Sequence, residues 1–158
     1  MPGCGKTTLA KAVGEATGLP WYDCDDLIEE KSGMRIAEVF DTWGESAFRT
    51  METAALIALC KREHCVIATG GGCVKRAENY DILHESGGVL WLERDLDKLP
   101  AAGRPLSAAK GIHTLYRERE ALYRRFADAR VDNNGTIEET VRQIKALFES
   151  TEYRRVNV

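Results

Sequence analysis

The chain has 158 residues, of which 44% are hydrophobic and 30% are charged, and its formal net charge at pH 7 is −3. This length predicts one soluble globular domain with a hydrophobic core of its own and leaves no room for a second domain. The acidic balance argues against nucleic acid or a membrane surface as partner, and neither a run that could span a bilayer nor a signal peptide is recognisable.

A glycine-rich turn followed at once by a helix opens the chain. Residues 1–8 read MPGCGKTT and match the end of the phosphate-binding P-loop motif GxxxxGK[ST]. Apolar residues at helical spacing predict a helix over 6–17, which Gly18 would end. The first glycine of the motif and the hydrophobic strand before it are absent, and we expect the natural start to lie about ten residues upstream.

The residue types in this turn suit a nucleotide phosphate site. Gly3 and Gly5 leave room for main-chain N–H groups to face phosphate oxygens at the positive end of the new helix. Lys6 would reach the outer phosphates, and the Thr7 hydroxyl would ligate a bridging Mg²⁺. The alternative is an ordinary glycine-rich helix start with an exposed lysine.

Three aspartates follow the first predicted strand, which covers residues 19–22. Open α/β sheets place ligands at the carboxyl ends of their strands, so Asp23, Asp25 and Asp26 form a candidate site. The alternative is that Asp25 or Asp26 only caps the next helix, which we expect over 27–31. Capping would explain one aspartate but not the whole cluster.

A short apolar face over 36–40 and a break at Gly44 precede a long helix, expected over 46–62. Its core stripe should consist of Phe48, Met51, Ala55, Leu56 and Leu59. Arg49 and Glu52 lie beside that stripe. For an isolated arginine on a helix, the usual interpretation is a solvated surface charge.

A glycine triplet, 70–72, ends the next apolar strand, which is predicted over 65–69. Three consecutive glycines cost conformational entropy that a plain turn does not require, so we expect a ligand to approach the main chain there. A helix over 78–84 and a buried strand over 88–92 come next.

The pattern loosens over 93–111, and residues 100–111 are rich in small residues and proline. A mobile segment of this length in a compact domain is usually either functional, such as a lid, or disordered. The following helix mixes aromatic and basic residues between 116 and 125, but its interleaved acids argue against a nucleic-acid face. A last strand is expected over 129–132. The side chains of the final helix that should face the core are Ile137, Val141, Ile144 and Phe148.

The alternation of strands and helices predicts an α/β fold, with a parallel sheet covered by helices on both faces. The missing strand would belong in the middle of that sheet. We expect a single domain over residues 1–150 and a polar tail over 151–158.

Six separated motifs resemble those of the shikimate kinase family in the same order, from Pro2 to about Glu149. The matching stretches are GCGKTT for Walker A, DCD at 23–25 for DxD, GESAFRTME at 44–52 for GExxFRxxE, the GGG loop at 70–72, GRPL at 103–106 for the lid, and REALY at 119–123 for RxPLY. The resemblance implies a three-layer P-loop kinase fold with a mobile lid. It also implies ATP-dependent phosphorylation of the shikimate 3-hydroxyl, a step toward chorismate and the aromatic amino acids.

The resemblance assigns roles to individual residues. Asp23 would support the magnesium site through water, Asp25 would hold ring hydroxyls and orient the attacking one, and Arg49 and Arg119 would clamp the substrate carboxylate. Glu52 would position Arg49. The residues expected to act are Lys6, Asp25 and Arg104 in catalysis; Gly3, Cys4, Gly5, Lys6, Thr7, Thr8 and Arg104 in ATP binding; Asp25, Arg49, Gly70, Gly71, Gly72 and Arg119 in substrate binding; and Thr7 and Asp23 at the metal.

The chain departs from the family pattern in the lid and around it. Ala121 stands where the family usually has proline, the lid is short, and no arginine precedes the RPL motif to stack on adenine. Lys98 is the nearest cation, and Asn133 and Asn134 are candidate adenine contacts.

The expected partners are two small molecules, ATP and shikimate, with Mg²⁺ as cofactor and a monomer as the working form. Five cysteines without a CxxC pair argue against a disulfide framework and a zinc site, and they indicate reduced thiols in a cytoplasm.

Two alternative functions stay open. One is a kinase for another small hydroxylated acid, such as gluconate, or for a nucleoside monophosphate. The other is a degenerate, non-catalytic domain that keeps the fold for binding or scaffolding.

Overall fold

Two pairs of short parallel strands form the middle of the molecule. The structure, a computed structural model, describes residues 1–99 and 111–149. Strand β1 (Trp21–Asp23) pairs with β2 (Val66–Ala68), and β3 (Leu90–Glu93) pairs with β4 (Ala129–Asp132). All of these strands are shorter than typical ones.

No ladder joins the two pairs anywhere in the described part of the chain. The register sets Trp21 opposite Val66 in the first pair and Leu90 opposite Ala129 in the second. A partly open pocket of about 50 Å³ is lined by Thr69, just beyond β2, and by β3. The sequence predicted a parallel sheet with a missing strand in its middle, and the described strands form two separate pairs.

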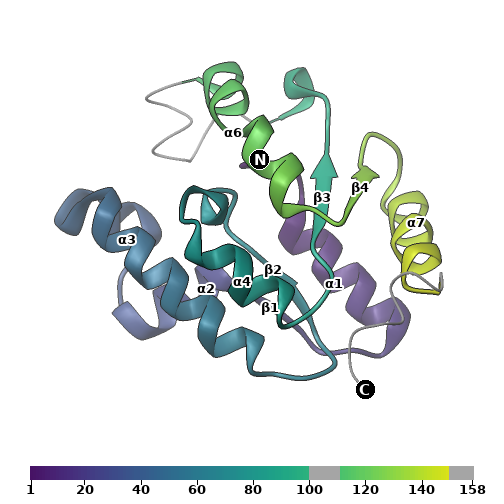
Figure 1. The fold of residues 1–158 in the computed structure, drawn as a ribbon, viewed down its shortest axis with the longest axis horizontal. Coiled ribbons are helices and arrows are strands. Elements are labelled where there is room, and N and C mark those ends of the chain that lie inside the picture. Colours follow the sequence, from purple (N-terminus) through teal and green to yellow (C-terminus); the bar gives the residue numbers. More distant parts are fainter. Residues whose placement is uncertain (100–110, 150–158) are drawn as a thin grey trace.

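Helices cover both faces of the strands, as Figure 1 shows. On one face, α1 (Lys6–Thr17) and α7 (Ile137–Glu149) share a buried apolar cluster with β4. On the other face, α3 (Ile36–Cys60), α4 (Glu78–His84) and α6 (Ile112–Phe126) surround the larger core cluster. The predicted α/β class, with parallel strands between two helical layers, is confirmed.

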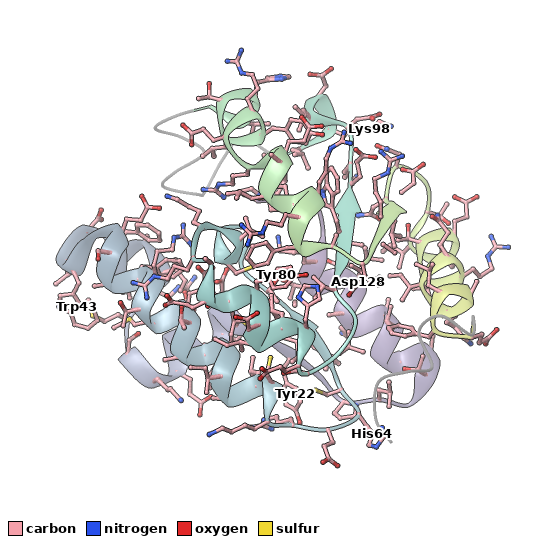
Figure 2. All side chains as sticks on the ribbon, viewed as in Figure 1. Tyr22, Trp43, His64, Tyr80, Lys98 and Asp128 are labelled. Atoms are coloured by element: carbon pink, nitrogen blue, oxygen red, sulfur yellow. The ribbon has the colours of Figure 1, made fainter. Side chains whose placement is uncertain are left out.

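A small lobe is formed where α2 (Cys24–Ser32) packs against α3. The residue at the predicted break, Gly44, has φ 78° and ψ 174°, so two helical segments meet there at a kink. Trp43 is 46% exposed on the outer end of this lobe, far from the strands (Figure 2). The lobe therefore extends one side of the molecule beyond the central layers.

Several predicted boundaries are confirmed, namely those of the helices over 6–17 and 78–84 and of the strand over 129–132. The helix expected over 27–31 begins earlier, at Cys24. The prediction that Ile137 and Phe148 face the core is wrong, because both are more than 40% exposed at the two ends of α7. Met51, which was predicted to belong to the core-facing stripe of the long helix, is only half-buried.

Some predictions fall on residues that the structure does not describe. The lid segment except Gly111, the catalytic candidate Arg104 and the tail over 151–158 lie outside the described ranges. Within those ranges, no helix has both the length and the hydrophobicity that a membrane crossing requires.

Candidate active site

The main chain before α1 has the conformation of a phosphate-binding turn. Gly3 and Gly5 have φ angles of 77° and 90°, a left-handed region that favours glycine. No side chain caps α1, whose first N–H groups have no intrahelical partners. An anion at this helix start would find free donors and the positive end of the helix dipole.

The Lys6 side chain folds back over the same turn. Its ammonium donates a hydrogen bond to the Met1 carbonyl at 2.9 Å and lies 3.9 Å from the Cys4 sulfur. The Cys4 side chain is fully buried beneath it. Lys6 therefore holds its charge beside the helix start, in the region where phosphate oxygens would bind.

Asn133, at the end of β4, anchors the phosphate-binding turn. Its Nδ2 donates to the Cys4 carbonyl at 2.6 Å, and its Oδ1 accepts from the Thr140 hydroxyl at 3.1 Å. Asn134 serves the neighbouring turn, where its Oδ1 accepts from the Asp95 main chain at 2.9 Å. Both amides thus have internal partners, and their contact with adenine stays a prediction.

We expect Asn133→Ala to lower the free energy of unfolding by about 1–3 kcal/mol, because it removes the buried hydrogen bond from Asn133 to the Cys4 carbonyl. The KM for ATP should rise as the turn loosens. Chemical denaturation and initial-rate kinetics measure the two effects. Asn134→Ala is the matched control and should cost less, so equal effects of the two variants would contradict the anchoring role.

Thr7 and Asp23 bring two oxygens together next to the turn. The Thr7 hydroxyl donates to Asp23 Oδ2 at 2.6 Å, and Asp23 Oδ1 accepts from the Asp25 N–H at 2.8 Å. The second bond caps α2, so the interpretation of Asp25 or Asp26 as the cap is wrong. Asp23 therefore links the phosphate turn to the segment that carries Asp25.

The oxygens of Thr7 and Asp23 suit Mg²⁺, which prefers hard oxygen ligands and keeps several waters. Within the described residues, no group of three or more His, Cys, Asp and Glu side chains could hold a metal. A metal at this pair would accordingly take its remaining ligands from water and from the nucleotide.

The glycine triplet is packed against the charged groups of the site. A Cβ on Gly70 would collide with the Glu52 carboxylate and would lie 3.6 Å from Asp25 Oδ1. A Cβ on Gly72 would overlap the Arg49 guanidinium. A larger residue at either position would force the Glu52 carboxylate or the Arg49 guanidinium to move, so glycine lets these side chains approach the main chain closely.

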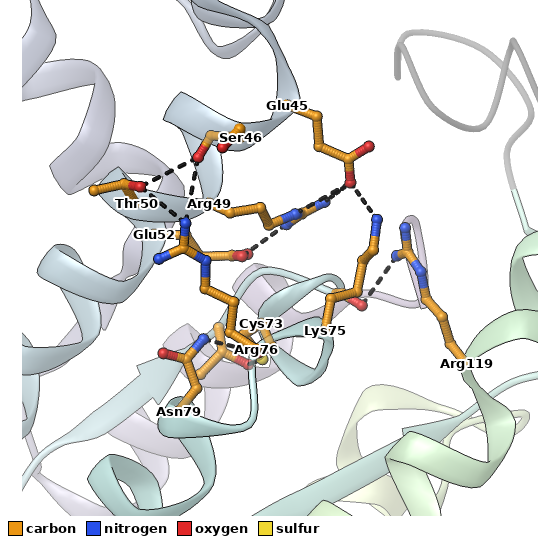
Figure 3. Close-up of polar contacts among 12 residues, drawn as sticks. Glu45, Ser46, Arg49, Thr50, Glu52, Cys73, Lys75, Arg76, Asn79 and Arg119 are labelled. Atoms are coloured by element: carbon orange, nitrogen blue, oxygen red, sulfur yellow. Dashed lines mark hydrogen bonds and ion pairs between the residues drawn. The ribbon is translucent and has the colours of Figure 1, made fainter.

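Arg49 is buried, so the interpretation of it as a surface charge is wrong. Its Nη1 donates to Glu52 Oε2 at 2.7 Å, and its Nε and Nη2 lie 3.3 Å from Glu45 Oε1 (Figure 3). Burial raises the pKa of Glu52, and the Arg49 charge opposes that rise. Glu52 fixes the guanidinium in place, as the resemblance implied.

Two side chains of α6 also bind the glycine triplet. Arg119 Nη1 and the Tyr123 hydroxyl both donate to the Gly71 carbonyl, at 3.1 and 2.5 Å. Arg119 is only 3% exposed. The two arginines that are far apart in the sequence therefore reach adjacent glycines, Arg49 at Gly72 and Arg119 at Gly71.

Tyr123→Phe should cost about 1 kcal/mol of unfolding free energy near pH 8, because it removes one buried hydrogen bond. Burial raises the pKa of Tyr123 from about 10 to about 12. The stabilisation by the protonated phenol is therefore complete below pH 10 and is lost as the pH rises toward 12. Denaturation of both proteins at several pH values checks this, and a constant difference up to pH 12 would contradict it.

Two anchoring residues, Asn79 and Tyr123, were not identified as site residues from the sequence, and Asn133 was expected only as an adenine contact. Asn79 is fully buried, and its Nδ2 donates to the Cys73 carbonyl at 2.8 Å, just after the triplet. One usable signal was present, because Asn79 precedes Leu83 by one helical turn and so lies on the apolar face of its helix.

A model of the shikimate kinase family matches residues 2–149. The chain belongs to the shikimate kinase family. A shikimate kinase of Clostridium botulinum is 37% identical over 154 residues, which cover 94% of this chain and 93% of the relative. One of Rhodopirellula baltica is 39% identical over 145 residues, covering 84% of this chain and 78% of the relative.

Solved structures of this kinase family share the fold. The shikimate kinase from Acinetobacter baumannii in complex with shikimate superposes with a TM-score of 0.86 at 32% identity, covering 93% of this chain and 88% of that chain. The Aquifex aeolicus enzyme gives a TM-score of 0.79 at 29% identity, covering 92% and 90%. The predicted family and its P-loop kinase fold are thereby confirmed.

Proposed function

We propose that this member of the shikimate kinase family transfers the γ-phosphoryl group of ATP to the 3-hydroxyl of shikimate. The observation that carries the proposal is the convergence of two buried arginines, Arg49 and Arg119, on the glycine triplet beside Asp25. A small hydroxylated acid needs such a site, with cations for its carboxylate and an oxygen acceptor for its hydroxyls.

On the acceptor side, the arginines would hold the carboxylate and Asp25 would hold the ring. Asp25 lies near Gly70 and follows the Asp23 cap, so its position is fixed by α2. In this role Asp25 orients the attacking hydroxyl and accepts its proton, which strengthens a weak oxygen nucleophile. Gly70, Gly71 and Gly72 would form the floor under the substrate.

On the ATP side, the N–H groups of residues 3–8 and the Lys6 ammonium would bind the β- and γ-phosphates. Thr7 would ligate Mg²⁺ directly and Asp23 would do so through water. When bound, the ion neutralises charge on the phosphates. Arg104 would join them from the lid, and its part in charge stabilisation rests on the family resemblance alone.

A coupled ADP-release assay tests the proposal. With ATP and Mg²⁺ present, we expect turnover with shikimate and none with gluconate or with nucleoside monophosphates. Turnover with one of these other acceptors and not with shikimate would overturn the substrate assignment. Absence of both turnover and ATP-dependent thermal stabilisation would favour a non-catalytic domain.

We further propose that the protein acts as a monomer in the cytoplasm. Size-exclusion chromatography with light scattering tests the first part of this proposal, and a mass of two chains or more would contradict it.

A further inference from the structure

A third cation lies at the acceptor site and belongs to none of the six motifs. Lys75 is the last residue of η1 (Cys73–Lys75), the single turn that follows the glycine triplet. Its ammonium makes a close hydrogen bond and ion pair with Glu45 Oε1. Figure 3 shows the ends of Lys75 and Arg49 meeting at this one carboxylate.

The contacts of Arg49 with its two glutamates are unequal. The bond from Nη1 to Glu52 is 2.7 Å, within the usual range for a charge-assisted hydrogen bond. Nε and Nη2 each lie 3.3 Å from a single oxygen of Glu45, which is a long and weak contact. This Nε–Nη2 edge is the fork that binds a carboxylate with two parallel bonds.

Glu45 therefore occupies the edge of Arg49 that an acidic substrate needs, but it is held mainly by another residue. The hydrogen bond from Lys75 is the largest influence on Glu45 and lowers its pKa, while Arg49 contributes less. The Lys75 and Glu45 side chains are each more than one third exposed, so they can rearrange when a ligand arrives.

We propose that Lys75 is a positioning residue for substrate capture, which retains the Glu45 carboxylate and so frees the outer edge of Arg49 for the carboxylate of shikimate. The inference rests on the proposed function. Without Lys75, the full charge of Glu45 would face Arg49 and would compete there with the substrate. The reacting hydroxyl lies elsewhere on the substrate, so the effect belongs to binding rather than to turnover.

Four variants test this inference in the intact protein: Lys75→Met, Glu45→Gln, the double variant, and Lys11→Met as a matched control. Lys11 forms a surface ion pair with Glu15 on α1, away from the acceptor site. We expect Lys75→Met to raise the KM for shikimate roughly two- to fivefold without changing kcat, as suits a partly exposed ion pair. In the Glu45→Gln background, the same substitution should leave KM unchanged.

Other patterns overturn the inference. An equal rise of KM in both backgrounds would mean that Lys75 binds the substrate directly or acts by long-range charge. A fall in kcat, or a rise of KM that Lys11→Met also produces, would assign Lys75 a general structural role. Wild-type protein that neither binds nor phosphorylates shikimate would instead overturn the proposed function, and the inference with it.

Discussion

Asp25→Asn should lower kcat by about 10²–10⁴-fold while the KM for ATP stays close to that of the wild type. The substitution keeps the size of the side chain but removes the carboxylate that is proposed to accept the proton. The main-chain bond from Asp25 to Asp23 is unaffected, so α2 should keep its cap. Initial rates with varied ATP and varied shikimate measure the two constants separately.

Asp26→Asn is the matched control for that experiment. Asp26 is the next residue on the same helical turn, and its side chain is exposed. Removal of its charge changes the net charge of the protein by the same amount without touching the proposed site. If Asp25→Asn turned over as fast as the wild type, Asp25 would have no catalytic role; equal losses in both variants would point to net charge.

Arg119→Lys should raise the KM for shikimate about 30- to 150-fold, with a smaller change in kcat. Lysine keeps the positive charge but cannot make two parallel bonds to a carboxylate, and the lost charge-assisted bonds are worth about 2–3 kcal/mol. The bond from Arg119 to the Gly71 carbonyl is also lost. Steady-state kinetics with varied shikimate check the prediction.

Tyr123→Phe separates the two functions of Arg119. Tyr123 donates to the same Gly71 carbonyl but is not expected to contact substrate. Its loss should therefore report only on how the glycine triplet is held. If Tyr123→Phe raised the KM for shikimate as much as Arg119→Lys does, the effect of Arg119 would come from loop anchoring, and the clamp would be contradicted.

Elements with strong local signals were predicted well from the sequence. The helix over 6–17 has regular apolar spacing and a terminal glycine, and its observed bounds are the predicted ones. The start of α2 was missed because Asp23 ends β1 and also caps the helix, so no spacer separates the two elements. The burial of Ile137 and Phe148 was predicted wrongly because apolar residues at the two ends of a helix can extend past the layer that the helix covers.

The residues of the site were predicted as a set, but the way they are held was not. The structure brings Thr7 to Asp23, Arg49 to Gly72 and Arg119 to Gly71. The anchors Asn133 and Tyr123 bond to the main chain of segments more than 50 residues away. Such bonds leave no periodic trace in the sequence. The binding roles of all these residues stay predictions.

The break between the strand pairs has a consequence for how the protein behaves at high concentration. Each described strand has only one paired neighbour, so β2 and β3 each have an edge whose main-chain donors and acceptors no described strand pairs with. Unpaired strand edges next to an apolar hollow are templates for extended segments of other molecules, and natural proteins usually cover or shorten them. Here the strands are short, and the hollow is bordered by β3 and by residues beyond β2. We therefore expect association at high concentration to start at these short strand edges rather than on the charged outer surface.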